Sequence, residues 1–413
     1  MIDLKYIREN PEEVKAAIAC RKDSAPLDEI LALDAERREK LALLEEKRRA
    51  KKEIARTSQQ SVVEEGRLMR DMIKSLEDRL REIDCKLGEL LLQVPNIPQA
   101  SVPRGQSEED NVIARSWGEP RCLPFPAQPH WELAQRLGII DFDRGVKLSG
   151  TRFYILMGLG ARLQRAVITF MLDLHTKEAG YKEVYPPYMV KREVMTCSGN
   201  LPKFADNLYH DDTDDMWFVP TAEVPLTGLH SGEILPPGTL PLYYAAYTAC
   251  FRREKMSAGK DTRGIKRGHQ FDKVELYKLT EPACSNDELE AMVKDVERVL
   301  QRLELPYRLK SLCTADLGFA SSKTYDIEVW APGCGEWLEV SSCSNCLDFQ
   351  ARRANIRYRT AEGARPEYIH TLNGSGLALP RIMIAIMENY QREDGTIMVP
   401  TALQGFMGAS LIS

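Results

Sequence analysis

The chain has 413 residues, of which 43% are hydrophobic and 28% are charged, and its net charge is −5. This composition is typical of a soluble globular protein with a large core, and it excludes a disordered chain, a collagen-like repeat and a small disulfide scaffold. Because the charges are balanced, any contact with nucleic acid must come from a local patch.

Membrane and export signals are not found in the sequence. No apolar run reaches the roughly 18 residues that a membrane-spanning helix needs. The first residues, Met1 to Lys5, lack the basic-then-apolar order of a signal peptide. The 10 cysteines have no framework spacing, which fits reduced thiols. We therefore expect a cytoplasmic protein that contacts no membrane.

The first hundred residues predict helices that form an arm. Asn10, Pro11 and two acids begin a short helix. A longer helix is expected from about Leu27 to Arg56, and the short segment 57–66 would let the next helix fold back on it. That next helix has a heptad seam with spacings of 4 and 3, formed by Met69, Ile73, Leu76, Leu80, Ile83, Leu87 and Leu90.

A basic cluster lies near the far end of the first arm helix. One interpretation is a solvated helix face, and the other is a stripe that binds phosphates of a nucleic acid. Its members are Lys47, Arg48, Arg49, Lys51, Lys52 and Arg56.

The composition changes after Leu92. Prolines at 95, 98, 103, 120, 124, 126 and 129 exclude a helix, so we interpret residues 99–130 as a linker between a helical domain (1–98) and a larger domain (131–413). The larger domain mixes short strands with helices and lacks the glycine-rich phosphate-binding signatures GxxxxGK[ST] and GxGxxG. We expect an α+β fold, an antiparallel sheet flanked by helices, preceded by an antiparallel two-helix coiled-coil arm.

Charged and aromatic residues gather on a predicted hairpin. On one strand, Arg252 and Glu254 would point to the same face of the sheet, and the return strand carries Phe271 and Glu275. A cation and a carboxylate on one face suit a ligand that has a phosphate and a hydrogen-bond donor. The alternative is a surface hairpin with ordinary cross-strand ion pairs.

Further candidate segments follow in the second half. One is Glu339–Ser342, and another runs from Asn373 to Arg381 through two glycines that permit close approach to a ligand. A helix that begins near Leu377 would bury Arg381, and a buried arginine needs an anion. That anion could be a ligand or a protein carboxylate.

In their order and amino-acid sequence, these segments resemble the seryl-tRNA synthetase family, a group of class II aminoacyl-tRNA synthetases. The resemblance covers nearly the whole chain, from the helical arm to Val399-Pro400. The class II motifs are matched by 180–187 (motif 1), 251–275 (motif 2) and 374–381 (motif 3). Two further segments, 221–223 and 348–353, are similar to short sequence motifs of the seryl enzymes.

The resemblance implies a role for each matching residue. Arg252, Glu254 and Arg381 would be catalytic. Thr221, Ala222, Glu223, Arg252, Glu275, Asn373 and Ser375 would bind serine. Arg252, Arg253, Glu254, Arg267, Phe271, Glu339, Val340, Ser341, Ser342 and Arg381 would bind ATP, and Glu339 and Ser342 would also hold its Mg²⁺.

The implied activity is that of a homodimeric serine–tRNA ligase. It would activate L-serine with ATP and Mg²⁺ and pass it to tRNA(Ser), and to tRNA(Sec) where the organism has one. Structural zinc is not expected, because the CxxC at Cys343 and Cys346 lacks further ligand pairs nearby. One alternative is a paralogue that makes the same adenylate but hands serine to a carrier protein or a biosynthetic enzyme; the carrier-protein ligases lack the arm. The other is an inactive paralogue that only binds RNA or a partner, which would have lost a motif residue.

Overall fold

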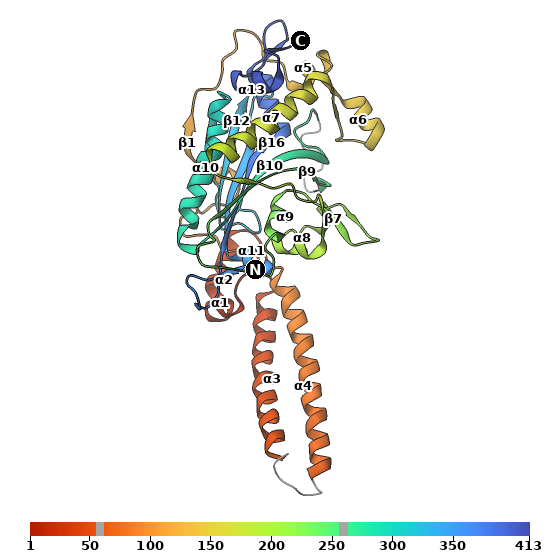
Figure 1. Cartoon of the computed structure of the whole chain (residues 1–413), viewed down its shortest axis with the longest axis vertical. Coiled ribbons are helices and arrows are strands. Elements are labelled where there is room, and N and C mark those ends of the chain that lie inside the picture. Colours follow the sequence, from red (N-terminus) through yellow and green to blue (C-terminus); the bar gives the residue numbers. More distant parts are fainter. Residues whose placement is uncertain (55–61, 256–262) are drawn as a thin grey trace. The chain divides into compact units, whose positions relative to one another are not determined.

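The computed structural model describes residues 1–54, 62–255 and 263–413. Contacts divide the chain into two compact units, Met1–Ile97 and Pro98–Ser413 (Figure 1). The first unit consists of helices, and the second combines helices with a large antiparallel sheet. The predicted α+β class is therefore confirmed.

Short helices begin the first unit, namely α1 (Leu4–Glu9) and α2 (Pro11–Cys20). The side chain of Asp3 accepts a hydrogen bond from the backbone N–H of Lys5 at 2.7 Å and so caps α1. Pro11 occupies the first position of α2, and acidic residues follow it in the first turn. The short helix predicted from these signals is confirmed.

The helices α3 (Leu27–Ile54) and α4 (Val62–Leu91) pack along each other in the first unit. Residues later on α3 pair with residues earlier on α4, so the two helices are antiparallel, as predicted. Leu44 packs against Ile73 and Leu80 of the predicted seam. Exposed ion pairs contribute little to stability, so the apolar seam is the main contact that holds the two helices together. The ion pairs described between the helices are Glu29–Lys86, Glu36–Arg79, Arg37–Asp84 and Arg48–Glu77.

A twisted sheet forms the centre of the second unit. Neighbouring strands are antiparallel except for the parallel pair β4–β9. In sheet order the strands are β1 (Val112–Trp117), β11 (Tyr307–Ser311), β12 (Lys323–Ala331), β13 (Glu336–Leu347), β16 (His370–Ala378), β10 (Gln270–Thr280), β9 (Leu242–Phe251) and β4 (Lys182–Glu183).

Different helices pack against each of the two faces of this sheet. Val274 and Leu276 of β10 belong to a core cluster with α7 (Gly158–Glu178), α10 (Ser285–Arg302) and α12 (Leu379–Asn389). Tyr277 and Leu279 belong to another cluster with α9 (Glu223–Gly228) and α11 (Phe349–Ala354). Because successive side chains of a strand point to opposite faces, residues at odd positions of β10 lie on the second face.

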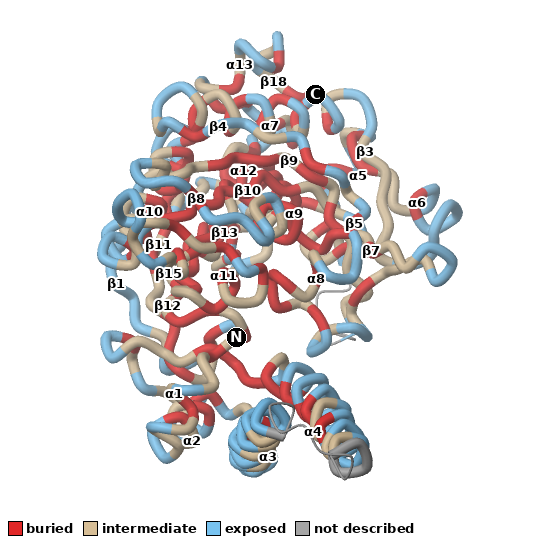
Figure 2. Tube along the Cα trace, turned by 60° about the horizontal axis from the view of Figure 1, so that its bottom comes forward, coloured by how far each residue is buried: buried red, intermediate tan, exposed pale blue. Residues whose placement is uncertain are grey.

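Shorter elements complete the second unit. Figure 2 shows buried residues gathered along the central strands. Within the described parts of the chain, no helix is both long and apolar enough to cross a membrane. The remaining elements are η1 (Glu108–Asp110), α5 (His130–Arg136), β2 (Ile140–Asp141), α6 (Phe142–Ser149), β3 (Ile155–Leu156), β5 (Met189–Lys191), α8 (Arg192–Ser198), η2 (Ala205–Asn207), β6 (His210–Asp211), β7 (Met216–Phe218), β8 (Ile234–Leu235), η4 (Pro282–Cys284), β14 (Arg357–Tyr358), β15 (Glu367–Tyr368), β17 (Ile397–Met398), α13 (Thr401–Met407) and β18 (Leu411–Ile412).

The segment 99–130, interpreted from its prolines as a linker, contributes to the sheet. Val112–Trp117 forms the edge strand β1 and pairs with β11. Its prolines lie before and after this strand, so they leave its ladder intact. The segment is therefore partly a structural element of the second unit.

Candidate active site

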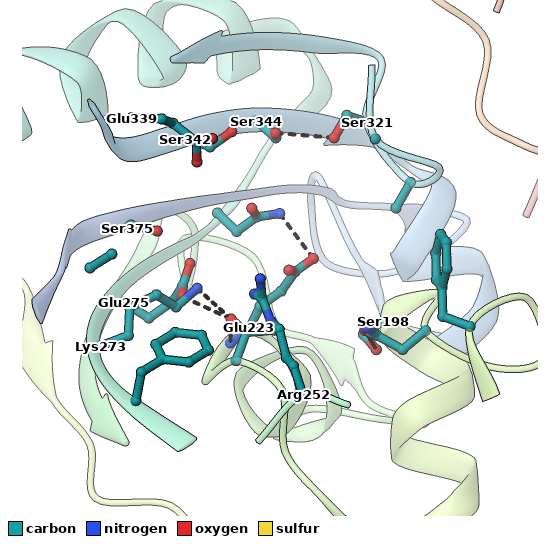
Figure 3. Close-up of a pocket in the computed structure, with 18 of the residues that line it drawn as sticks. Ser198, Glu223, Arg252, Lys273, Glu275, Ser321, Glu339, Ser342, Ser344 and Ser375 are labelled. Atoms are coloured by element: carbon teal, nitrogen blue, oxygen red, sulfur yellow. Dashed lines mark hydrogen bonds and ion pairs between the residues drawn. The ribbon is translucent and has the colours of Figure 1, made fainter. Parts of the chain in front are cut away.

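A cavity of about 340 Å³ lies against strands β10, β13 and β16 of the second unit (Figure 3). Segments far apart in the sequence meet there, because the sheet places β10 between β9 and β16. Most of the predicted serine and ATP residues line it. These are Thr221, Glu223, Arg252, Glu254, Arg267, Phe271, Glu275, Glu339, Ser342, Asn373, Ser375 and Arg381.

One end of the cavity, the polar end, is formed by Thr221, Glu223, Lys273, Glu275 and Asn373. The Thr221 hydroxyl donates to Oε2 of Glu275 at 2.8 Å and accepts from Nζ of Lys273 at 2.7 Å. Lys273 also forms an ion pair with Glu275, and side-chain exposure is only 8% for the lysine and 1% for the glutamate. A cation and an anion this deeply buried need each other, since removing one leaves the other uncompensated.

Glu223 is the second carboxyl group of the polar end. Its Oε1 accepts hydrogen bonds from Nε2 of Gln350 at 2.6 Å and from Nδ2 of Asn373 at 3.1 Å. Burial, followed by the charge of Glu275, raises the pKa of Glu223 to about 7. Lys273 therefore compensates Glu275 more fully than it compensates Glu223.

The other end, the arginine end, is formed by Arg252, Arg267, Arg381, Glu254, Phe271 and Glu339. Arg252 lies over the ring of Phe271, with Cζ 5.1 Å from the ring centroid. Two other guanidinium groups face carboxylates. Nη1 of Arg267 is 3.5 Å from Oε2 of Glu254, and Nη1 of Arg381 is 3.2 Å from Oε1 of Glu339.

The prediction that a strand carries both Arg252 and Glu254 is wrong. Strand β9 ends at Phe251, and Glu254 has a φ of +49°, in the left-handed region. A non-glycine residue rarely adopts this conformation, which alternation along a strand cannot foresee. The turn nevertheless leaves both side chains on the cavity wall.

A bulge in β13 brings Glu339 and Ser342 to the same cavity. Ile327 of β12 pairs with Ser341, whereas the next residue, Glu328, pairs with Glu339, so Val340 is the extra residue. Without this bulge, residues three positions apart would point to opposite faces.

Four of the predicted ligand-binding residues lie outside the cavity lining as the structure describes it. The side chains of Ala222 and Val340 are buried in apolar clusters. Ser341 donates its hydroxyl hydrogen bond to the carbonyl of Ser375 at 2.6 Å. Arg253 donates from Nε to the carbonyl of Leu208 at 2.8 Å. Their side chains are occupied within the fold, so a ligand contact from these four residues stays a prediction.

Sequence reasoning missed Lys273, the cation of the polar end. It lies two residues before Glu275 on β10, and the period of two predicts that both side chains share a face. Ser198, Phe204, Lys266 and Phe319 also line the cavity, but they come from separate loops and helices, and no local sequence signal groups them.

The predicted basic cluster lies on α3 in the first unit, except for Arg56, which is outside the described residues. Lys47, Arg48 and Arg49 form ion pairs with acidic neighbours. Lys51 and Lys52 are exposed, and neither forms an ion pair with another described residue. Within the basic cluster, these two lysines are therefore the most available to bind an external anion.

Family models match both units of the chain. The model for the seryl-tRNA synthetase N-terminal domain matches residues 1–98. The model for the class II tRNA synthetase core domain (G, H, P, S and T) matches residues 203–390.

Whole-chain relatives agree with these matches. A serine–tRNA ligase of Dehalococcoides mccartyi is 61% identical over 100% of both chains, and one of Thermomicrobium roseum is 56% identical over 99% of this chain and 94% of its own. Among solved structures, seryl-tRNA synthetase from Pyrococcus horikoshii complexed with ATP has a TM-score of 0.94 at 40% identity, covering 100% of this chain and 99% of that one. The cytoplasmic serine–tRNA ligase of Naegleria fowleri in complex with AMP has a TM-score of 0.91 at 29% identity, with the same coverage. The chain belongs to the seryl-tRNA synthetase family.

Proposed function

We propose that this chain, a serine–tRNA ligase by family, forms seryl-adenylate in the cavity and passes the seryl group to tRNA(Ser). A carboxylate oxygen of serine attacks the α-phosphorus of ATP, and the bond to the bridging oxygen breaks to release pyrophosphate. A terminal ribose hydroxyl of the tRNA then attacks the seryl carbonyl carbon and releases AMP. The observation that carries this proposal is the single cavity in which a buried polar end meets an arginine end.

The arginine end suits ATP. Arg252 would hold the α-phosphate and offset the charge that develops there, and Arg267 and Arg381 would hold the outer phosphates. Phe271 would stack under the adenine, and Glu254 would accept from its amino group. Because Arg267 and Arg381 already face carboxylates, bound phosphates would take over part of an existing pairing, which limits the cost of binding.

Glu339 and Ser342 suit the Mg²⁺ that accompanies ATP. They offer a carboxylate and a hydroxyl oxygen, the hard ligands that Mg²⁺ takes, and the bulge at Val340 places both on the cavity wall. Mg²⁺ neutralises phosphate charge when bound. The chain's own contribution is to hold these oxygens beside Arg381.

The polar end suits serine. Thr221, Glu275 and Ser375 supply partners for the serine hydroxyl, and Glu223 supplies a carboxylate for its ammonium group. Alanine would leave buried polar groups unpaired, which costs about 1–3 kcal/mol and favours serine. Rejection of threonine depends instead on the volume of this end.

The first unit suits tRNA. We assign phosphate contact to the basic face of α3, above all to Lys51 and Lys52, and tRNA(Sec) is a second expected substrate. A homodimer, with motif 1 at its interface, and a cytoplasmic location remain predictions from the resemblance.

Charging of purified tRNA(Ser) with labelled serine tests the whole reaction. We expect seryl-tRNA to accumulate with ATP and Mg²⁺ and to disappear when either is omitted. Formation of the adenylate without charging would indicate a carrier protein as the acceptor and would contradict the tRNA part of the proposal.

A further inference from the structure

A buried hydrogen-bond network lies outside the described lining of the cavity. It consists of His130 at the start of α5, Glu388 on α12, and Cys334 in the turn between β12 and β13. His130 is 1% exposed and Glu388 is fully buried. A carboxylate in such a place must be compensated by hydrogen-bond donors.

Glu388 receives donors from two separate segments. Its Oε1 accepts from the backbone N–H and from Nδ1 of His130, both at 2.9 Å, and from Sγ of Cys334 at 3.0 Å. Its Oε2 accepts from the backbone N–H groups of Gly333 and Cys334 at 2.9 and 3.0 Å. Burial acts to raise the pKa of Glu388, but the hydrogen bonds from His130 and Cys334 outweigh it and lower the pKa. Glu388 is therefore an ionised anchor.

His130 links Glu388 to the segment around Ile265, which lies between strands β9 and β10. The backbone N–H of Ile265 donates to Nε2 of His130 at 3.2 Å. Nε2 must therefore carry a lone pair, and a neutral ring then has its proton on Nδ1, where it donates to Glu388. Both ring nitrogens are used, and each has a fixed role.

Ile265 immediately precedes two residues of the cavity wall, Lys266 and Arg267. Arg381, another residue of the arginine end, lies on the same helix as Glu388, seven residues or about two turns earlier. The hydrogen bonds from Ile265 to His130 and from His130 to Glu388 therefore connect the backbone that carries Arg267 to the helix that carries Arg381.

Gly264 shows how closely this segment approaches the histidine. It has a φ of +73°, and a Cβ added there would lie 2.0 Å from Nε2 of His130. Any side chain at this position would push the segment away from the ring.

We propose that His130 and Glu388 are positioning residues for ATP: they hold Ile265, and with it Lys266 and Arg267, at the distance from Arg381 that the triphosphate requires. This inference rests on the ATP site proposed at the arginine end. Neither residue is among the described lining residues of the cavity, and the contact acts on the segment that carries Arg267, so removing it should weaken ATP binding and spare serine binding.

A metal site is the competing explanation, because the ligand atoms of His130, Cys334 and Glu388 lie within 4.8 Å of one another. A metal on Nδ1 would require the ring proton to move to Nε2, where it would face the N–H of Ile265. Hydrogen bonding satisfies all three groups without that conflict.

Two histidine variants separate the two ring nitrogens. In His130→Asn the amide can replace Nδ1 toward Glu388 but does not reach Ile265, whereas in His130→Gln the amide oxygen can replace Nε2. In serine-dependent ATP–pyrophosphate exchange with the full chain, we expect His130→Asn to raise the KM for ATP about tenfold and to keep the KM for serine within about twofold. His130→Gln should restore most of the ATP affinity. Gly264→Ala should resemble His130→Asn, and it tests the same contact if the histidine variants do not fold.

Cys334→Ala is the matched control. It removes a donor to Glu388 but leaves the contact between His130 and Ile265, so the KM for ATP should not change. The proposal fails if folded His130→Asn and Gly264→Ala keep the wild-type KM for ATP, or if the KM values for ATP and serine rise together. One zinc ion per wild-type chain that is lost in Cys334→Ala would also overturn it. Absence of serine-dependent exchange in the wild type would instead contradict the proposed function itself.

Discussion

The two ends of the cavity differ in how their charges are compensated before any ligand arrives. At the polar end, Lys273, Thr221 and Glu275 form a closed set of contacts at almost no exposure. At the arginine end, Arg267 and Arg381 are partly exposed, and their carboxylate partners lie more than 3 Å away. The charges of the polar end are thus compensated within the protein, as in a preformed site, whereas a highly charged ligand at the proposed ATP site would exchange with the carboxylate partners of the arginine end.

The difference predicts that substitutions at the arginine end affect the chemical step. Substitutions at the polar end should instead affect the selection of serine over other amino acids and the stability of the fold. Four experiments separate these effects.

The largest effect is expected for Arg252→Ala. Loss of a guanidinium that neutralises the reacting phosphate should lower serine-dependent exchange by about 10³-fold, since one such group stabilises a transition state by roughly 3–4 kcal/mol. Circular dichroism should show an unchanged fold, because the one hydrogen bond described for the Arg252 side chain is to the carbonyl of Pro220, and the substitution keeps the backbone bonds to His269. Exchange within tenfold of the wild type would contradict the role given to this arginine.

Glu223 gives the polar end a pH-dependent stability. Its carboxyl is protonated below about pH 7 in the folded chain, but only below its usual value of 4.5 in the unfolded chain. The folded state therefore holds an extra proton between these values, and stability falls as pH rises through that window, by about 3 kcal/mol in total.

Glu223→Gln should remove this dependence. Chemical denaturation of both proteins at pH 5 and pH 8 checks it: relative to the variant, the wild type should lose stability at the higher pH. Equal pH dependence in the two proteins would show that Glu223 does not titrate in this range.

A smaller effect is expected for Thr221→Val, which keeps the shape and removes the hydroxyl. The preference for serine over alanine, measured as the ratio of kcat/KM values in exchange, should fall by about tenfold. Thr280→Val, at the end of β10, is the control, because its buried hydroxyl has no partner among the described residues. An unchanged ratio in Thr221→Val would place the hydroxyl contact elsewhere.

An effect of similar size is expected in the first unit, and it should leave both ends of the cavity unaltered. Reversing Lys51 and Lys52 to Glu should weaken tRNA binding about tenfold near 0.1 M salt and reduce its salt dependence. Reversing the exposed acids Glu45 and Glu46 to Lys on the same helix should strengthen binding. If neither pair of changes alters affinity, this helix face is simply solvated.

The elements that the sequence predicted best are those whose signals are local. The antiparallel arm follows from a heptad seam, and the cavity strand β10 follows from motif 2. Such patterns depend on neighbours a few residues away, so one sequence is enough to find them.

The features that escaped prediction depend on distant partners or on unusual backbone. Strand β1 pairs with β11, almost 200 residues later, and the bulge at Val340 depends on its register with β12. The left-handed conformation of Glu254 has no propensity signal, because this conformation is uncommon for glutamate. The resemblance named most of the cavity residues, whereas Lys273 and the network around His130 emerged only from the fold.

The most direct test of the central claim, that one cavity joins a serine site to an ATP site, is ATP–pyrophosphate exchange with each of the twenty amino acids. We expect exchange with serine and none above background with alanine at the same concentration. Exchange with a different amino acid, or with none, would contradict the account.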